Sequence, residues 1–132
     1  MAQQLPELIQ LIKTIDMKLI DSTHTKLLAK AMDVYTLRNK ITAANISNID
    51  TPGYKKGTVK FEEELSRRLD SGFTSKKQVA DLNPVISQTD EKPIIEDELM
   101  ELADTQIRVQ MVTRALRHNF EQLRMGIIGR AG

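Results

Sequence analysis

The chain of 132 residues contains no cysteine and no tryptophan, and aromatic residues make up only 4% of it. The absence of cysteine excludes disulfides and thiolate metal sites. With so few large rings, the apolar residues are mostly Leu, Ile, Val, Ala and Met, a set that favours helix-on-helix packing. No uncharged apolar run of about 18 residues occurs, so no transmembrane helix is predicted.

The chain also lacks a charge of one dominant sign, because 19 basic residues balance 18 acidic ones and the net charge is +1. This balance gives no reason to expect nucleic acid as the main partner. Glu7, Lys13 and Asp16 interrupt the apolar residues of the N-terminus. A cleaved secretory signal needs a clean apolar run after a basic start, so export by that route is not predicted.

The pattern divides the chain into three parts, at residues 1–48, 49–93 and 94–132. The first is helical, with a kink or restart expected at residues 21–25, where Asp, Ser, Thr and His favour caps and turns. Its predicted wet side carries Lys30, Asp33, Arg38 and Lys40. The second part holds the turn-forming residues, and we expect a short strand at 58–61, a short helix at 62–69 and an irregular remainder.

The third part has the most regular apolar spacing of the chain. Positions repeat at alternating intervals of four and three residues, and most of them are apolar, which predicts a coiled-coil helix. The seam comprises Ile95, Leu99, Leu102, Gln106, Val109, Thr113, Leu116, Phe120, Leu123 and Ile127. Two helices that touch along one stripe bury little surface for the backbone entropy that ordering them costs. We therefore expect neighbouring subunits to complete the core.

The segment from Asn45 to Lys55, with the sequence NISNIDTPGYK, joins a helix end to a tight turn. Pro52 presets φ at the second position of a type II turn, and Gly53 accepts the positive φ required at the third. Asn45 and Asn48 are three residues apart and share one helical face. Their amides are able to fasten the chain's own turn or to cap the backbone of a neighbouring chain.

This segment resembles the N-terminal signature of bacterial flagellar axial proteins, the family that builds the rod and hook. The matching positions are Asn45, Ile46, Asn48, Asp50, Thr51, Pro52, Gly53, Tyr54 and Lys55. The short chain without a large insert resembles the proximal rod members of that family. The resemblance implies a mainly α fold, in which N- and C-terminal axial helices form an antiparallel coiled-coil hairpin around an extended, largely irregular middle segment.

The resemblance also implies a function. The chain would be a structural rod subunit in the periplasmic basal body, with no cofactor and no catalytic, metal-binding or small-molecule site. Its partners would be copies of itself, other rod proteins, proteins of the membrane ring and rod base, and the flagellar type III export apparatus. The chain would leave the cytoplasm through that apparatus without a cleaved signal peptide and would transmit torque from the membrane ring to the distal rod and hook.

Phe61 and Leu65 form a separate candidate site. Their spacing is similar to the element by which rod and hook subunits are recognised at the export gate. The same four-residue spacing puts both side chains on one helical face that is able to pack on the chain's own helices. A soluble helical adaptor or chaperone that binds a partner helix would also explain the apolar seam, although it would not explain the signature. An enzyme is the least favoured class, because no cluster of reactive groups is evident.

Overall fold

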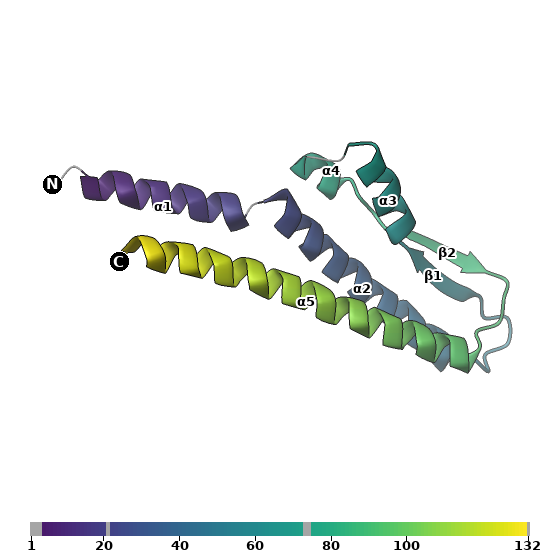
Figure 1. Cartoon of the computed structure of the whole chain (residues 1–132). Coiled ribbons are helices and arrows are strands. Elements are labelled where there is room, and N and C mark those ends of the chain that lie inside the picture. The colour runs from purple at the N-terminus through teal and green to yellow at the C-terminus, as the bar shows by residue number, and fades with distance from the viewer. Residues whose placement is uncertain (1–3, 21, 73–74, 132) are drawn as a thin grey trace.

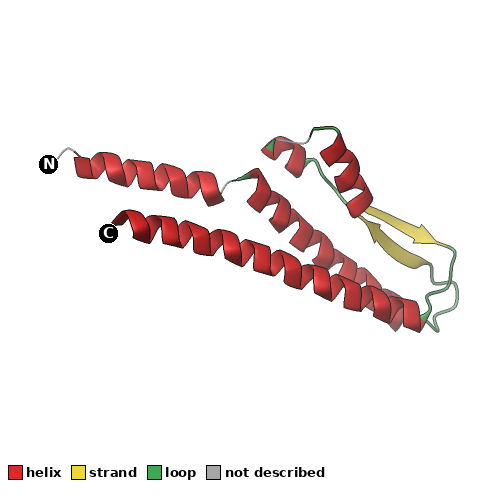
Figure 2. Ribbon diagram, in the orientation of Figure 1, coloured by secondary structure: helices red, strands yellow, loops and turns green. Residues whose placement is uncertain are grey.

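The computed structural model describes residues 4–20, 22–72 and 75–131. In these residues the chain forms five helices and two strands (Figures 1 and 2). They are α1 (Gln4–Ile20), α2 (Thr23–Ser47), β1 (Lys56–Lys60), α3 (Glu62–Asp70), α4 (Lys76–Ala80), β2 (Val85–Thr89) and α5 (Ile95–Ala131). The fold is therefore mainly α with one small sheet. None of the described helices combines the length and the hydropathy that crossing a bilayer requires.

The long axis of the molecule consists of α2 and α5, which pack side by side and run in opposite directions (Figure 1). α1 lies roughly in line with α2 and contacts the C-terminal part of α5. Between α1 and α2, Ser22 caps the new helix, because its hydroxyl accepts a hydrogen bond from Thr25 N at 3.1 Å. α1 ends at Ile20 and α2 begins at Thr23, within the region where the sequence predicts a kink or restart, and residue 21 lies outside the described residues.

The predicted seam of α5 divides between two environments. One half is partly buried, and it comprises Leu102, Val109, Leu116, Leu123 and Ile127. The other half is exposed in the single chain, and it comprises Ile95, Leu99, Gln106, Thr113 and Phe120. The fully buried positions of α5 are instead Glu98 and Thr105, which the apolar pattern did not select because both residues are polar.

The middle of the chain is more regular than the sequence pattern predicts. The expectation of an irregular segment from residue 70 to residue 93 is wrong, because α4 and β2 form there. β2 pairs with β1 in an antiparallel register from Lys56↔Thr89 to Lys60↔Val85. A capping box begins α4, with Ser75 and Gln78 bonding to each other's backbone. β2 gave no clear apolar period because its exposed residues occupy both faces of the strand.

The core is small and lies where α2 meets the sheet and the segment after α4. It consists of Ala31, Val34, Tyr35, Val59, Phe61 and Leu82. The accessible surface of the chain is 9480 Å². A compact monomer of 15.0 kDa would expose only about 7,000 Å². The additional accessible surface reflects an elongated molecule whose long helices are covered on one side only. Many large apolar side chains are therefore in contact with solvent.

Candidate assembly site

The signature segment ends α2 and makes the tight turn that leads into β1. The backbone N–H of Tyr54 donates to the carbonyl of Thr51 at 3.3 Å, and Gly53 has a φ of 73°. This is the positive φ that the third position of a type II turn requires. Apart from the two adjacent residues, no atom of the described chain lies within 4 Å of the position where a Cβ on Gly53 would stand. Glycine is therefore required there by backbone conformation and not by space.

Asn45 is the centre of the site and is only 1% exposed. Its amide nitrogen donates to the carbonyl of Gly57 at 2.8 Å and to Oε2 of Glu98 at 3.0 Å. Its amide oxygen accepts from Gly57 N at 2.9 Å and from the hydroxyl of Tyr54 at 3.0 Å. One side chain thus joins α2 to the turn, to β1 and to the beginning of α5. Asparagine suits this position because it carries both donors and an acceptor.

Asn48 has a more local role. Its amide nitrogen donates to the carbonyl of Ala44 at 2.8 Å, and its amide oxygen accepts from the hydroxyl of Thr51 at 3.1 Å. Both bonds are exposed, and both lie within the end of α2 and the turn. The two asparagines therefore both bond within their own chain, Asn45 across elements and Asn48 along the chain.

Glu98 is almost completely buried, and its charge is balanced by Lys56. The ammonium nitrogen of Lys56 lies 2.9 Å from Oε1 of Glu98. The hydrogen bond to Glu98 raises the pKa of Lys56 above its ordinary value, and burial opposes this shift only in part. Together with Asn45, this pair fastens β1 and the N-terminal turn of α5 to the end of α2.

A second polar cluster lies two helical turns earlier on α2. Arg38 is 5% exposed and forms a bidentate pair with Glu62, with distances of 2.8 and 2.7 Å. Its guanidinium also donates to the carbonyl of Val59 at 3.1 Å and lies 3.5 Å from Glu101 of α5. The expectation that Arg38 lies on the wet side of its helix is therefore wrong, because its charge is paired inside the fold.

The charges of this cluster stabilise one another. The hydrogen bond from Arg38 lowers the pKa of Glu62 below its ordinary value, and the same bond raises the pKa of Arg38. Arg108 of α5 adds a further contact to Glu62 at 3.2 Å. The Arg38 guanidinium also lies over the ring of Tyr35, 5.4 Å from its centre. This cluster joins α2, β1, α3 and α5.

A cavity of about 350 Å³ separates the two polar clusters. It is bounded by α2, β1 and the first turns of α5, and its lining includes Arg38, Thr42, Asn45 and Glu98. The fit of β1 against α2 is nevertheless close at one point. A Cβ added at Gly57 would stand 2.8 Å from a methyl group of Ile41. Glycine at this position therefore lets the strand approach the helix closely.

The remaining signature residues lie at the tip of the molecule. Asp50, Thr51, Pro52, Gly53 and Lys55 are exposed, whereas Ile46 is half-buried. Lys55 forms an exposed ion pair with Asp90 at 3.0 Å, and this pair links the turn to the segment that follows β2. The exposed pair contributes little to stability. The tip residues are thus free to contact other molecules.

Phe61 and Leu65 both contact the core. Phe61 is 1% exposed, and Leu65 is partly buried and packs against the same cluster. In the folded chain the first aromatic residue of the candidate export element is therefore covered. Any recognition of Phe61 by another protein requires that this part of the chain be unfolded.

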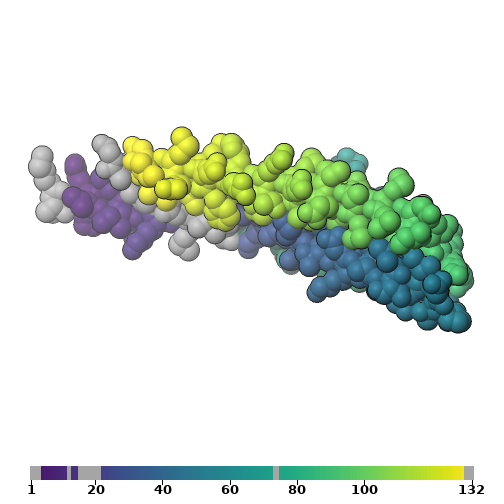
Figure 3. Space-filling model, turned by 90° about the horizontal axis from the view of Figure 1, so that it is seen from below, coloured from purple at the N-terminus to yellow at the C-terminus, as the bar shows by residue number. Residues whose placement is uncertain are grey.

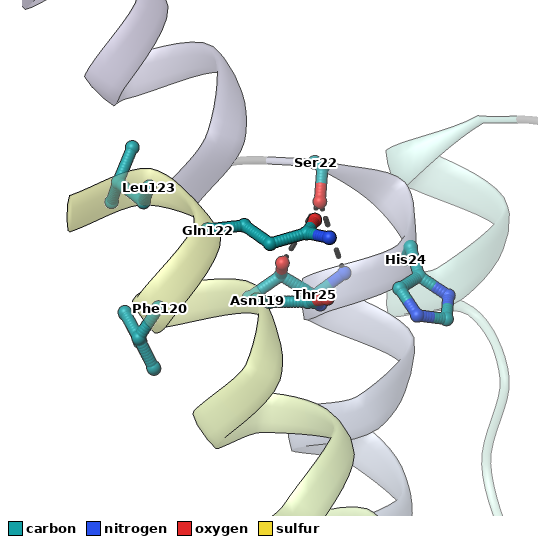
Figure 4. Close-up of a pocket in the computed structure, with 7 residues that line it drawn as sticks. All are labelled: Ser22, His24, Thr25, Asn119, Phe120, Gln122 and Leu123. Carbon is teal, nitrogen blue, oxygen red and sulfur yellow. Dashed lines mark hydrogen bonds between the residues drawn. The ribbon is translucent and has the colours of Figure 1, made fainter. Parts of the chain in front are cut away.

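A second pocket lies far from the signature, near the start of α2. This pocket of about 160 Å³ lies between the first turn of α2 and the C-terminal part of α5. Figure 4 shows its lining residues, with the capping bonds from Ser22 to Thr25 at one side. The side chains of Phe120 and Leu123 on α5 form its apolar side. Phe120 is one of the seam residues that the single chain leaves exposed.

The face of α5 that lies away from α2 carries a row of exposed apolar side chains. Their spacings of seven, four, fourteen and three residues put them on one side of the helix. They are Met100, Ile107, Met111, Met125 and Ile128, and each is between 58 and 72% exposed. In Figure 3, α5 is visible along its length on the face of the molecule that is shown. α1 exposes a further apolar group, formed by Leu5, Leu8, Ile9 and Leu11.

Sequence reasoning selected the turn and both asparagines but missed the buried charged residues of the two polar clusters. Glu98, Lys56, Arg38 and Glu62 were not selected, because isolated charges usually lie in solvent. One signal was present in the sequence. Arg38 and Asn45 are seven residues apart, so they lie on the same face of α2 as the apolar residues of the core.

The fold and the site define a mainly helical protein whose signature motif fastens its own elements together. The family model described as flagella basal body rod protein matches residues 37–55, a range that includes Arg38, Asn45 and the turn. A flagellar basal body rod protein FlgB of Borrelia hermsii is 47% identical over 38 residues, which are 29% of this chain and 28% of that protein. FlgB of Borreliella burgdorferi is 44% identical over 36 residues, or 27% of each chain.

The resemblance to flagellar rod proteins predicted from the signature is thus confirmed: the family model matches at the signature, and the two similar relatives are FlgB proteins. The matched segments span little more than a quarter of the length of those relatives.

Proposed function

We propose that this protein is a structural subunit of the proximal rod of the bacterial flagellar basal body. Copies of it pack with one another and with other rod proteins, and the packed helices transmit torque from the membrane ring to the distal rod and hook. The protein performs no catalysis and needs no cofactor. The family-model match at the signature and the likeness to two FlgB proteins support this assignment.

The observation that carries the proposal is the uncovered apolar face of α5. Monomeric soluble proteins rarely expose large apolar patches, and this row recurs along a helix of 37 residues, with polar residues on the same face between Met111 and Met125. The row from Met100 to Ile128 and the exposed half of the seam, with Leu99 and Phe120, lie on different sides of α5. An assembly in which α5 contacts neighbours on both sides would cover them. In that assembly the coiled-coil packing expected from the seam is completed between subunits.

The polar clusters supply the stiffness that such an assembly requires. Apolar contacts between helices are not directional, so packed helices are able to slide past one another. The hydrogen bonds of Asn45 and Arg38 form only when the sheet lies at one position on α2 and α5. The exposed tip, with Pro52 and Lys55, is then held at a fixed angle to α2 and α5. We propose that the tip contacts the next subunit along the rod and sets the angle between them.

The location and export route follow from the same assignment. The assembled protein lies in the periplasmic part of the basal body, next to the membrane-ring and rod-base proteins. It reaches that position through the flagellar type III export apparatus without a cleaved signal peptide. Phe61 and Leu65 engage the export gate while the chain is unfolded and become part of the core when it folds, which is consistent with the burial of Phe61.

The substitution Ile107→Lys tests the proposal. Ile107 is exposed and belongs to no core contact, so the variant is expected to melt at the same temperature as the original chain. A charge in the apolar row should nevertheless prevent packing with neighbours. When the variant replaces the original gene in the bacterium that encodes it, we expect loss of rods from purified basal bodies and loss of swimming.

Thr36→Lys is the matched control, because it adds the same charge to an exposed polar position of a helix, on α2 and away from the apolar row of α5. This variant should assemble and swim. Normal rods with Ile107→Lys would contradict the packing role of the row. Normal flagella in a strain that lacks the gene would contradict the rod assignment itself and would favour the helical adaptor.

A further inference from the structure

The two-stranded sheet has two outer edges, and side chains of α2 close one of them. The backbone N–H of Gly57 donates to the amide oxygen of Asn45, and its carbonyl accepts from the amide nitrogen of the same residue. The carbonyl of Val59 accepts from Arg38. Three of the four outward backbone groups of Gly57 and Val59 therefore have side-chain partners on α2.

The strand register then fixes which groups of β2 point outward. Opposed residues of an antiparallel pair alternate between pairs that exchange hydrogen bonds and pairs that do not. Gly57 and Val59 bond to α2, so the pairs Gly57↔Gln88 and Val59↔Ile86 belong to the second kind. The N–H and C=O groups of Ile86 and Gln88 consequently point away from β1. Within the described part of the chain, no hydrogen bond to these groups is found.

This open edge lacks the features that usually prevent strand pairing. Monomeric proteins protect a free edge with charged residues, proline, a bulge or a covering element. β2 has the sequence VISQT, which contains no charge and no proline and is rich in β-branched residues. Val85 and Ile86 are 53 and 57% exposed. In Figure 1, β2 lies on the outer side of the sheet, away from α2 and α5.

We propose that β2 pairs with β2 of a second copy of this chain, antiparallel and centred on Ser87. In this register Ile86 faces Gln88 of the partner subunit, and Gln88 faces Ile86 of the partner subunit. These are the residues whose backbone groups point outward, so the edge is complementary to itself and forms four hydrogen bonds. Because the strand is uncharged, the two copies meet without like-charge repulsion. The product is a four-stranded antiparallel sheet.

The pairing goes beyond the rod function and does not depend on it. A twofold contact uses the same surface on both copies and is closed, whereas a helical rod grows through unlike surfaces. The pair is therefore a state of free subunits in solution. It covers an edge that would otherwise accept strands from unrelated chains.

Single cysteines test the register, because the chain has no cysteine of its own. In the proposed pair the two Ser87 residues stand opposite each other with Cα atoms about 4.5–5.5 Å apart, within the range that a disulfide spans. Purified Ser87→Cys should therefore form a covalent dimer under mild oxidation. Val85→Cys is the control, because it lies on the same face and is well exposed. Its two copies would stand about 14 Å apart, too far for a disulfide.

We expect Ser87→Cys to cross-link at least about tenfold faster than Val85→Cys. A second substitution, Gln88→Pro, removes an outward N–H that the β1–β2 ladder does not use, so the fold should persist. In the Ser87→Cys background it should reduce cross-linking to the level of the Val85→Cys control. Equal rates for the two cysteine variants, no cross-linking of Ser87→Cys, or undiminished cross-linking with the proline would each overturn the proposal. A covalent product with a different protein in cells, without the homodimer, would overturn it as well.

Discussion

Replacing Asn45 with alanine should be the most damaging single change in the signature. It removes four hydrogen bonds of 2.8–3.0 Å and leaves buried groups of Gly57 and Glu98 without a partner. Three bonds join neutral groups, worth about 1 kcal/mol each, and the fourth reaches a carboxylate, worth about 1.5–3 kcal/mol. Because the adjoining cavity of about 350 Å³ lets water replace part of this bonding, the expected loss is about 3–5 kcal/mol.

The loss is measured by urea unfolding of the purified protein, followed by circular dichroism. It would remove a large share of the about 5–15 kcal/mol by which domains are usually stable. Hydrogen exchange at the Gly57 amide gives a local readout, because that N–H donates to Asn45. Asn48→Ala is the control from the same motif. Its bonds are exposed and local, so its cost should stay below about 1 kcal/mol.

The isosteric change Asn45→Asp separates the loss of bonding from the loss of packing. Aspartate keeps the acceptor for Gly57 and Tyr54 but brings a carboxylate to about 3 Å from that of Glu98. Like charges raise the pKa of such a pair, so this variant should be unstable at neutral pH and should regain stability as the pH falls. Asn45→Ala should show no such recovery. An Asn45→Ala variant no less stable than Asn48→Ala would refute the central role of this side chain.

Three further changes test other parts of the site. Gly53→Val should lower the free energy of unfolding by about 1–2 kcal/mol and impair rod assembly, because the positive φ of this position resists a β-branched residue. Gly53→Asn should have a smaller effect in urea unfolding and in swimming assays, because φ and not space restricts the position. Phe61→Ala and Leu82→Ala should each cost about 3–5 kcal/mol in urea unfolding. If Phe61 binds the export gate, only Phe61→Ala should reduce secretion. Equal secretion of the two variants would contradict the export role of Phe61. Because the pKa of Glu62 is lowered, its ion pair with Arg38 contributes stability above about pH 4.5. This stability is lost as the pH falls through the pKa of Glu62 in the folded state. Glu62→Gln should therefore flatten the dependence of the urea midpoint on pH in that acidic range.

The turn was predictable because its requirements are local. Pro52 and Gly53 restrict the backbone wherever they occur in this order, and the positive φ of Gly53 follows from them. The partners of Asn45 were not predictable in the same way. Gly57 is near in sequence, but Glu98 comes from 53 residues further along the chain, and only the packing of α5 on α2 brings it there.

The apolar pattern predicted the helix α5 but not which side of it faces α2. Its four–three spacing fits several neighbouring stripes, and the buried stripe contains Glu98 and Thr105. Polar partners on α2 and β1 decide the choice, because a buried carboxylate needs Asn45 and Lys56 beside it. β2 was missed for a related reason. A strand with one partner and two exposed faces has little apolar alternation for a pattern to detect.

The arrangement of the two clusters explains why polar residues occupy the inside of so small a fold. Asn45 bonds to both β1 and α5, and Arg38 contacts both β1 and α5 as well, through Val59 and Glu101. Any displacement of the sheet therefore breaks bonds that also position α5. Apolar side chains of similar size would hold these elements together equally well, but they would tolerate a range of angles. Two polar contacts seven residues apart on one helix therefore fix the angle at which the sheet and α5 lie against α2.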